Sequence, residues 1–225
     1  MSDRCVVIGA GGHAKTAVDI LVRNGVQIAG VTDVPDRAGT SFQGYPILGG
    51  DDRLADIYAS GVHAAAMGIG HVGNPQIRNA IYERVRETGF LFLNLVHPSA
   101  VLAETVCCGD GNLFAANSVV NAGARIGSLC IVNTAAVIEH DADIADGVHI
   151  APHAVVLGEA AIGRNTFVGA GSVVLQGVSI GSNCLVGAGS VVLHDVEDDC
   201  VVIGNPGRIL RRRQPWEYIS LPKPE

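Results

Sequence analysis

One of the eight histidines stands between two acidic residues, in the run Glu139-His140-Asp141. An imidazole exchanges its proton close to neutral pH, and a neighbouring carboxylate can orient the ring and stabilise its cation. This combination suits a general base, which removes a proton from a nucleophile as it attacks. The alternative interpretation is an exposed histidine beside two solvated acids.

A glycine-rich segment, Gly9-Ala10-Gly11-Gly12-His13-Ala14, is the second place where chemistry is expected. It follows an apolar run at 4–8 that predicts a buried strand. A helical pattern at 15–23 and a second apolar strand at 27–31 come after it. Strand, glycine turn, helix and strand together predict a βαβ unit.

The spacing within this segment is typical of nucleotide binding. Gly9, Gly11 and Ala14 satisfy G-x-G-x-x-(G/A), a turn in which the backbone approaches a phosphate at the start of a helix. Asp33 lies about where an acidic residue would meet a ribose hydroxyl. A tight strand-to-helix turn that binds nothing remains the alternative.

A six-residue repeat occupies the second half of the chain. Sixteen successive positions at this spacing are apolar: Leu102, Cys108, Phe114, Val120, Ile126, Val132, Ile138, Ile144, Ile150, Val156, Ile162, Val168, Val174, Ile180, Val186 and Val192. Period six fits neither a helix nor a hairpin sheet, but it fits a parallel β-helix of hexapeptide repeats. Cys130 and Cys184 take the small position of their hexads, so we expect buried thiols that form no acyl-enzyme.

The length of a coil predicts which residues stack on His140. If three hexads form a coil, one coil has eighteen residues, and His140 stacks between Ala122 and Gly158. Both neighbours are minimal, which leaves space around the imidazole. His140 also lies two residues after the core position Ile138, so it is expected at a bend and facing outward.

The residues before the repeat predict a small α/β domain. Its further expected elements are a helix at 51–58, a strand at 62–67, a helix at 74–87 and a strand at 90–93. We therefore divide the chain into an α/β domain at 1–97, a β-helix at 98–205 and a carboxyl-terminal tail at 206–225.

Composition excludes several classes of protein. The net charge is −7, whereas a general nucleic-acid binder would show a basic footprint. The six cysteines include no CxxC pair, which favours cytosolic thiols over a disulfide framework. No apolar run is long enough to span a bilayer and no secretion signal is evident, so we expect a cytoplasmic protein without membrane or nucleic-acid partners.

Three motifs together resemble one known family. The glycine turn, the I-G-x-x-x-N segment at 69–74 and the I-E-H-D segment at 138–141 look like those of hexapeptide-repeat sugar-nucleotide N-acetyltransferases of the bacillosamine and perosamine type. Sialic-acid O-acetyltransferases share this layout. The resemblance implies a Rossmann-like nucleotide-sugar domain followed by a left-handed, three-sided parallel β-helix.

The resemblance also implies an activity. It would be direct transfer from acetyl-CoA, without a metal, to the 4-amino group of a nucleotide-linked 4-amino-4,6-dideoxy sugar such as GDP-perosamine or a UDP-4-amino sugar, in glycan (O-antigen) biosynthesis. Family members are homotrimers with active sites between neighbouring prisms, and outward Val155, Leu157 and Leu175 would supply apolar contact.

Site residues follow from the same resemblance. His140 would be the general base and Asp141 its carboxylate partner. The residues implied to meet acetyl-CoA are His149, Gly158, Ala170 and Arg208, the last of which follows Gly204-Asn205-Pro206. Those implied to meet the nucleotide part of the acceptor are Gly12, His13, Asp33 and Gly70.

Other functions stay open at this point. Sialic-acid or other sugar O-acetylation is the nearest alternative. A zinc-dependent prism hydratase would need three converging histidines, and His140, His149 and His153 lack that spacing. A non-catalytic nucleotide-binding scaffold is a third possibility. The residues do not distinguish GDP, UDP and CMP as the carrier.

Overall fold

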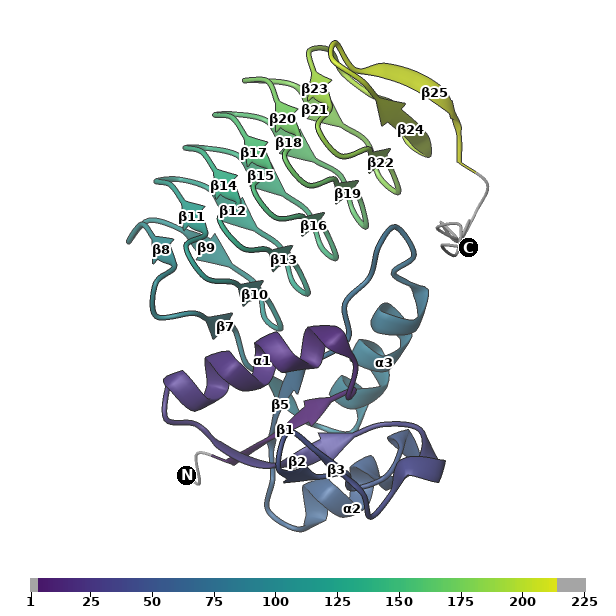
Figure 1. Ribbon diagram of the computed structural model, residues 1–225. Helices are drawn as coiled ribbons and strands as arrows, with labels where there is room; N and C mark the ends of the chain where they lie inside the picture. The colour runs from purple at the N-terminus through teal and green to yellow at the C-terminus, as the bar shows by residue number, and fades with distance from the viewer. Residues whose placement is uncertain (1–3, 214–225) are drawn as a thin grey trace.

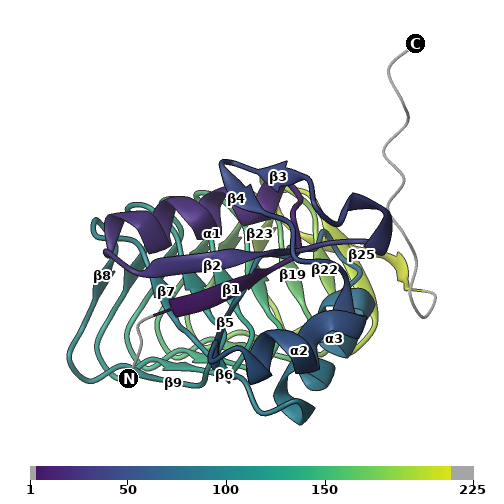
Figure 2. The same cartoon turned by 90° about the horizontal axis from the view of Figure 1, so that it is seen from below.

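The computed structural model describes residues 4–213. It consists of an α/β domain packed against a three-sided prism of short strands (Figure 1). Seen from below, α1, β1 and β2 run along the length of the prism, in the direction in which its coils are stacked (Figure 2). No helix among the described residues is long and apolar enough to cross a membrane.

The α/β domain contains one parallel sheet with the strand order β2-β1-β5-β6. Its elements are β1 (Arg4–Ile8), α1 (Gly12–Arg23), β2 (Gln27–Thr32), the 3-10 turn η1 (Pro35–Arg37), β3 (Ser41–Phe42), β4 (Tyr45–Pro46), the 3-10 turn η2 (Asp51–Arg53), α2 (Leu54–Ala59), β5 (Ala64–Met67), α3 (Gln76–Glu87) and β6 (Leu91–Phe92). The expected alternation of strands and helices is confirmed. The β3–β4 hairpin was not predicted, because each of its strands has only two residues.

Strand β1 shows how the domain is held in place. Successive side chains of a strand point to opposite faces, so Cys5 and Val7 pack with α1 and with Leu113 and Ile131 of the prism. Val6 and Ile8 instead join the core formed with α2 and α3. Helix α1 is therefore enclosed between the sheet and the prism, which fixes the glycine turn at its start.

Three parallel sheets form the faces of the prism. The docked face, against which the α/β domain packs, contains β7 (Leu95–Val96), β10 (Leu113–Phe114), β13 (Ile131–Val132), β16 (His149–Ile150), β19 (Phe167–Val168), β22 (Leu185–Val186), β24 (Cys200–Ile203) and the antiparallel β25 (Arg208–Arg212). The valine face contains β8 (Val101–Leu102), β11 (Val119–Val120), β14 (Val137–Ile138), β17 (Val155–Val156), β20 (Val173–Val174) and β23 (Val191–Val192). The third face contains β9 (Cys107–Cys108), β12 (Arg125–Ile126), β15 (Asp143–Ile144), β18 (Ala161–Ile162) and β21 (Ser179–Ile180).

The eighteen-residue coil is confirmed by the strand register. Val119 pairs with Val137, which pairs with Val155, and each step advances eighteen residues. The hexad residues from Phe114 to Val192 form one buried core. Cys130 and Cys184 lie within it, as expected, and burial raises the pKa of the Cys130 thiol to about 12.

The repeat departs from the expected pattern at both ends. Cys108 occupies a core position but is exposed, because β9 is the edge strand of the third face. At the other end Val186 pairs with Val202, sixteen residues on, so the last coil is two residues short. Prism strands extend from Leu95 to Arg212, beyond the expected limits at 98 and 205.

Candidate active site

His140 lies at the corner where β14 turns into β15. Its Nδ1 is 3.0 Å from Asp141 Oδ2, and its side chain is 49% exposed. Because a carboxylate accepts a hydrogen bond, Nδ1 carries the proton and Nε2 keeps its lone pair. Asp141 holds this position with a φ of 58°, a left-handed conformation that aspartate tolerates better than most residues. The pair thus has the tautomer that a general base needs.

Gly158 lies one coil beyond His140 and directly against its ring. A Cβ atom built on Gly158 would be 2.6 Å from Nε2 and 2.7 Å from Cε1. The next residue, Glu159, donates its N–H to the His140 carbonyl at 3.0 Å, which fixes the stacking. The Gly158 N–H itself has no hydrogen-bond partner among residues 4–213. A free backbone donor therefore lies beside the basic nitrogen.

Acidic groups surround this corner. The hydrogen bond to Asp141 raises the pKa of His140, and the charges of Asp141, Glu139 and Glu159 act in the same direction. The corner therefore attracts cations and stabilises the imidazolium that proton removal would create.

A cavity of about 740 Å³ lies beside the glycine turn. Its walls include Gly11, Gly12, His13, Gly68, Gly70, His71, Asn74, Arg78 and His149. Helix α1 begins here with Gly11 as its N-cap, and no acidic residue occupies its first turn. The positive end of the helix dipole is thus uncompensated by any side chain of that turn. A Cβ on Gly70 would approach His13 Cγ to 3.0 Å, so the second glycine turn packs closely on the first.

Three buried imidazoles in the cavity wall are held neutral. His149 Nδ1 donates to the His71 carbonyl at 2.8 Å, and Nε2 accepts from Asn133 Nδ2 at 3.1 Å. His71 Nε2 donates to the Gly147 carbonyl at 3.2 Å. Burial lowers the pKa of His13 to about 3 and that of His149 to about 4, and it lowers the pKa of His71 well below its usual value. His71 and His149 thereby join the α/β domain to the prism without carrying charge.

Arg78 supplies the positive charge of this wall. Its Nε donates to the Ile69 carbonyl at 2.7 Å and Nη1 to the Leu129 carbonyl, while Nη2 has no hydrogen-bond partner in the described part of the chain. Burial lowers its pKa to about 10, which leaves it a cation at neutral pH. Among the described residues no carboxylate pairs with it. A buried cation without a counter-ion is costly, and an anionic ligand would relieve that cost.

Sequence reasoning missed Arg78 and His71. The signal for Arg78 was present, because it shares the buried face of α3 with Tyr82 and Val85 at helical spacing. An arginine on an otherwise apolar face is a marker of a buried polar site. His71 gave no such signal, since its contacts come from coils more than seventy residues away.

A second cavity, of about 460 Å³, lies on the other side of the glycine turn. Gly9, Asp33 and Gly50 line it, together with Ile69 and Ile77, which also border the first cavity. Asp33 accepts the Val34 N–H at 2.8 Å and forms an ion pair with Arg37. The carboxylate that was expected to meet a ribose hydroxyl therefore already has two partners.

The remaining expected residues lie at other corners and at the end of the prism. Ala170 is exposed at the corner between the docked and valine faces, and its N–H is unpaired within residues 4–213. Arg208 begins β25 and is exposed, and its guanidinium bonds the Gly207 carbonyl at 3.1 Å. The structure places His149 with His13 in the cavity wall, not beside Gly158.

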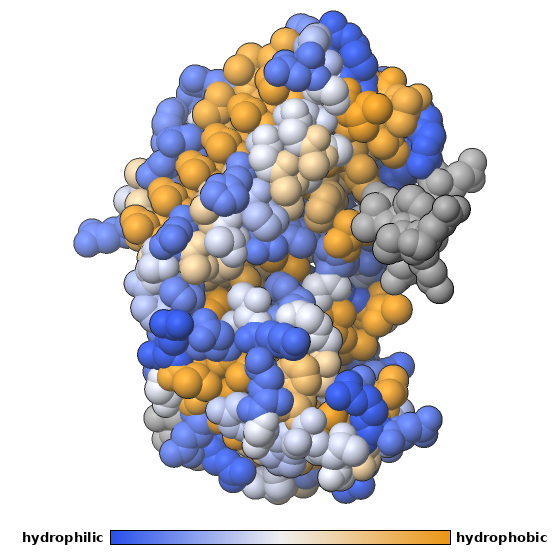
Figure 3. Space-filling model, in the orientation of Figure 1, coloured by the Kyte–Doolittle hydropathy of each residue, from blue (hydrophilic) through white to orange (hydrophobic). Residues whose placement is uncertain are grey.

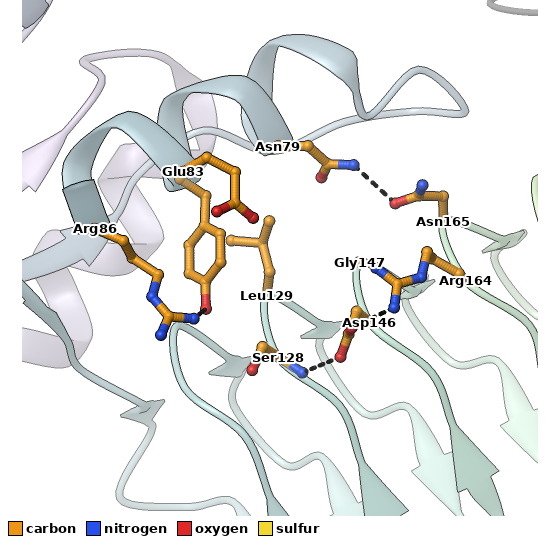
Figure 4. Close-up of a pocket in the computed structure, with 10 residues that line it drawn as sticks. Asn79, Glu83, Arg86, Ser128, Leu129, Asp146, Gly147, Arg164 and Asn165 are labelled. Carbon is orange, nitrogen blue, oxygen red and sulfur yellow. Dashed lines mark hydrogen bonds and ion pairs between the residues drawn. The ribbon is translucent and has the colours of Figure 1, made fainter.

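A small polar cavity of about 170 Å³ separates α3 from the prism corner at 128–129, 146–147 and 164–165 (Figure 4). Asn79 Nδ2 donates to Asn165 Oδ1 at 3.0 Å across it. Arg164 and Asp146 form an ion pair at 2.9 Å on the prism side. These contacts orient α3, and with it Arg78, against the prism. No group of three His, Cys, Asp or Glu side chains between residues 4 and 213 is arranged to hold a metal ion.

Fold and site together define a class of protein: a hexapeptide-repeat acyltransferase with an added nucleotide-type domain. Residues 4–85 match the PglD N-terminal domain, and residues 159–194 match the bacterial transferase hexapeptide (six repeats). The chain is 35% identical to PerB from Caulobacter crescentus, solved with CoA and GDP-perosamine, over 91% of this chain and 96% of that one, with a TM-score of 0.86. The chain belongs to this family of hexapeptide-repeat sugar N-acetyltransferases.

The chain is also similar to two further proteins. The acetyltransferase domain of PglB from Neisseria gonorrhoeae FA1090, solved with acetyl coenzyme A, is 32% identical over 93% of this chain and 100% of that one, with a TM-score of 0.85. An uncharacterized protein, L142, of Acanthamoeba polyphaga mimivirus is 31% identical over 128 residues, which is 56% of this chain. The chain matches only 24% of the length of that curated relative.

Proposed function

We propose that the protein transfers an acetyl group from acetyl-CoA to the 4-amino group of a nucleotide-linked 4-amino-4,6-dideoxy sugar. The observation that carries this proposal is the His140–Asp141 pair with its basic Nε2 against Gly158, whose N–H has no partner among the described residues. A proton acceptor and an oxyanion donor are the two groups that aminolysis of a thioester requires.

The reaction follows from this geometry. The amine nitrogen attacks the thioester carbon, and Nε2 of His140 takes the proton that the nitrogen loses. The negative charge that develops on the carbonyl oxygen is stabilised by the Gly158 N–H. Collapse of the tetrahedral intermediate breaks the carbon–sulfur bond, and the imidazolium returns its proton to the leaving CoA thiolate. Asp141 keeps Nδ1 protonated throughout and stabilises the transient cation.

The acceptor's nucleotide belongs at the glycine turn. The helix N-terminus and the uncompensated charge of Arg78 favour the diphosphate in the larger cavity. The second cavity, with Asp33 at its edge and the isoleucines Ile69 and Ile77 in its wall, suits the nucleoside. PerB of Caulobacter crescentus holds GDP-perosamine, and this supports the same class of acceptor here.

The charge of the His140 corner favours an amine over a sialic acid as acceptor. An amino sugar reaches the site largely as an ammonium ion, which the carboxylates of Glu139, Asp141 and Glu159 attract, and it releases one proton to solvent before the neutral amine attacks. A sialic acid carries its own carboxylate, which the same groups repel. Sugar O-acetylation is therefore the weaker of the two candidates.

A neighbouring copy of the chain is needed to bring the two half-sites together. The His140 corner joins the valine and third faces, so it lies opposite the docked face, where the glycine turn and its cavity are. Every outward residue of the valine face is a valine: Val101, Val119, Val137, Val155, Val173 and Val191. The expected contacts Val155 and Leu157 are half-buried, and Leu175 is 40% exposed. Figure 3 shows a band of hydrophobic residues, in orange, over the prism. An uncovered apolar face of this kind supports a homotrimer closed by three-fold symmetry.

An assay with defined acceptors tests the proposed function. Purified protein is incubated with acetyl-CoA and the GDP- or UDP-linked 4-amino sugar, and release of the CoA thiol is followed together with product mass. We expect an alkali-stable amide from wild type. His140→Ala should lower kcat by about 10²–10⁴-fold while both substrates still bind.

Two outcomes would contradict the assignment. An alkali-labile ester product would move the protein to the O-acetyltransferases. Retention of more than about a tenth of wild-type kcat by His140→Ala would place the base elsewhere, since that loss is far short of the usual range. Histidine variants of the Caulobacter crescentus relative have been solved with both CoA and GDP-perosamine bound, so binding without the histidine has a precedent.

A further inference from the structure

The loop that closes the glycine-turn cavity is held by the prism as well as by its own domain, where Gly68 donates its N–H to the Ile8 carbonyl and Arg78 Nε donates to the Ile69 carbonyl. This loop, residues 68–74, contributes Gly68, Ile69, Gly70, His71, Val72 and Asn74 to the cavity wall. Two contacts come from the prism: His71 Nε2 donates to the Gly147 carbonyl at a corner, and His149 Nδ1 of the docked face donates to the His71 carbonyl. Both act on one residue near the middle of the loop.

A third contact holds the loop further along and comes from the carboxyl-terminal end of the described residues. Arg213, which directly follows β25, donates Nη2 to the Gly73 carbonyl and Nη1 to the Asn183 carbonyl, the latter at 2.9 Å. Its own N–H donates to the Asp199 carbonyl at 2.6 Å. One guanidinium thus bridges the loop and the carboxyl-terminal coils, across 140 residues of sequence.

We infer that Arg213 is a positioning residue for the acceptor: it sets the place of the 68–74 loop and thereby the shape of the nucleotide-sugar cavity. Gly73 has a φ of 76° and no side chain of its own to anchor it. Backbone rich in glycine is mobile unless it is tied down. Val72, beside it, is 62% exposed and so adds little packing. The charge-assisted hydrogen bond from Arg213 to the Gly73 carbonyl fixes this part of the loop.

This inference rests on the proposed function, because it assigns the cavity to the acceptor. It predicts a kinetic asymmetry between the two substrates. Arg213→Ala should raise KM for the nucleotide sugar by about tenfold, the effect of losing one charge-assisted hydrogen bond, and leave KM for acetyl-CoA unchanged. Arg213→Lys keeps one donor and should restore part of the loss.

Arg212→Ala is the matched control. Arg212 is the preceding residue, and it bonds Glu197 and the Asp198 carbonyl rather than the loop. Amide hydrogen exchange on the unliganded protein gives a readout that is independent of activity. Residues 68–74 should exchange faster in Arg213→Ala and at the wild-type rate in Arg212→Ala.

The outcomes separate this inference from the proposed function. Equal acceptor KM values in the Arg213→Ala and Arg212→Ala variants would overturn the inference, and so would a fall in kcat and in both affinities that tracks a lower Tm. If wild type bound no nucleotide sugar, the proposed function would fail. The role of Arg213 in holding the loop would then be decided by exchange alone: faster exchange only in Arg213→Ala supports it, and unchanged exchange refutes it.

Discussion

The His140 imidazole lies so close to Gly158 that no residue with a side chain fits at position 158 unless the ring moves. A Cβ at residue 158 would be 2.6 Å from Nε2 and 3.2 Å from Cδ2. Real Cβ atoms almost never approach other atoms closer than 3.0 Å, so an alanine here must displace the imidazole. The glycine and the histidine are eighteen residues apart and meet only because the coils stack in register.

Gly158→Ala should therefore reduce kcat by at least about tenfold. The added methyl group pushes Nε2 away from its position beside the unpaired N–H, and a misplaced base loses rate steeply with distance. The backbone at Gly158 is not in the left-handed region, so alanine adds no strain of that kind. Kinetics should show the loss in kcat, with the Tm within a few degrees of wild type. Unchanged kcat would mean that the ring does not work from its present position.

Asp141→Asn should move the rising limb of the kcat–pH profile to lower pH. The hydrogen bond to Asp141 and the nearby charge raise the pKa of His140, so the base is freed only above its ordinary value near 6.5. A neutral amide removes that charge, the imidazolium becomes less stable, and the limb shifts down. The plateau should fall as well, because an amide N–H facing Nδ1 selects the wrong tautomer.

Asparagine is the right substitution for this test, because residue 141 has a φ of 58°, which asparagine also tolerates. The acceptor's own ionisation is the same in both profiles, so it cancels in the comparison. A limb at the wild-type pH would show that Asp141 does not set the proton affinity of the base.

The repeat made part of the site predictable. The spacing of the hexads, together with the three-sided coil that the family resemblance implied, placed Gly158 on His140, because a coil of constant length converts a sequence interval into a contact. Arg78, His71 and Arg213 escaped prediction for the opposite reason. Their partners are set by how the α/β domain docks on the prism, and no period connects Arg78 with Leu129 or Arg213 with Gly73.

The ends of the prism show the same limit. Cys108 satisfies the apolar repeat, yet it is exposed, because a repeat specifies the inward direction but not whether another coil covers it. The shortened last coil at Val202 and the returning strand β25 depend on local backbone geometry at the end of the repeat. They carry no periodic signal.

The protein should lose stability between pH 6.5 and about 4. His13 and His149 have pKa values of about 3 and about 4 in the folded chain, and the pKa of His71 is also depressed, whereas all three return to about 6.5 on unfolding. Below pH 6.5 these histidines therefore bind protons in the unfolded state but not in the folded state. Each of these histidines costs up to about 1.4 kcal/mol per pH unit in this window, and none above it.

Urea midpoints measured at pH 7, 6 and 5, at fixed protein concentration, check this prediction. His149→Asn gives the control, because the asparagine amide can still donate to the His71 carbonyl but does not titrate. Its stability should fall less steeply with acidification than that of wild type. Parallel slopes for the two proteins would show that His149 takes up its proton in the folded state.

Arg208→Glu should raise KM for acetyl-CoA by about ten- to hundredfold and leave KM for the acceptor unchanged. Arg208 is exposed at the start of β25, and within residues 4–213 its guanidinium bonds only the adjacent Gly207 carbonyl, so its charge is available to a phosphate of the donor. A charge-assisted contact to phosphate accounts for a loss of this size. Acetyl-pantetheine, which lacks the nucleotide phosphates, separates this effect from a general one: its KM should be the same with wild type and variant. Arg23→Glu, on α1 at the opposite part of the molecule, makes the same change in net charge and should leave both donors unaffected. If the variant weakened acetyl-pantetheine as much as acetyl-CoA, the phosphates would lie elsewhere and Arg208 would act through the shape of the prism end.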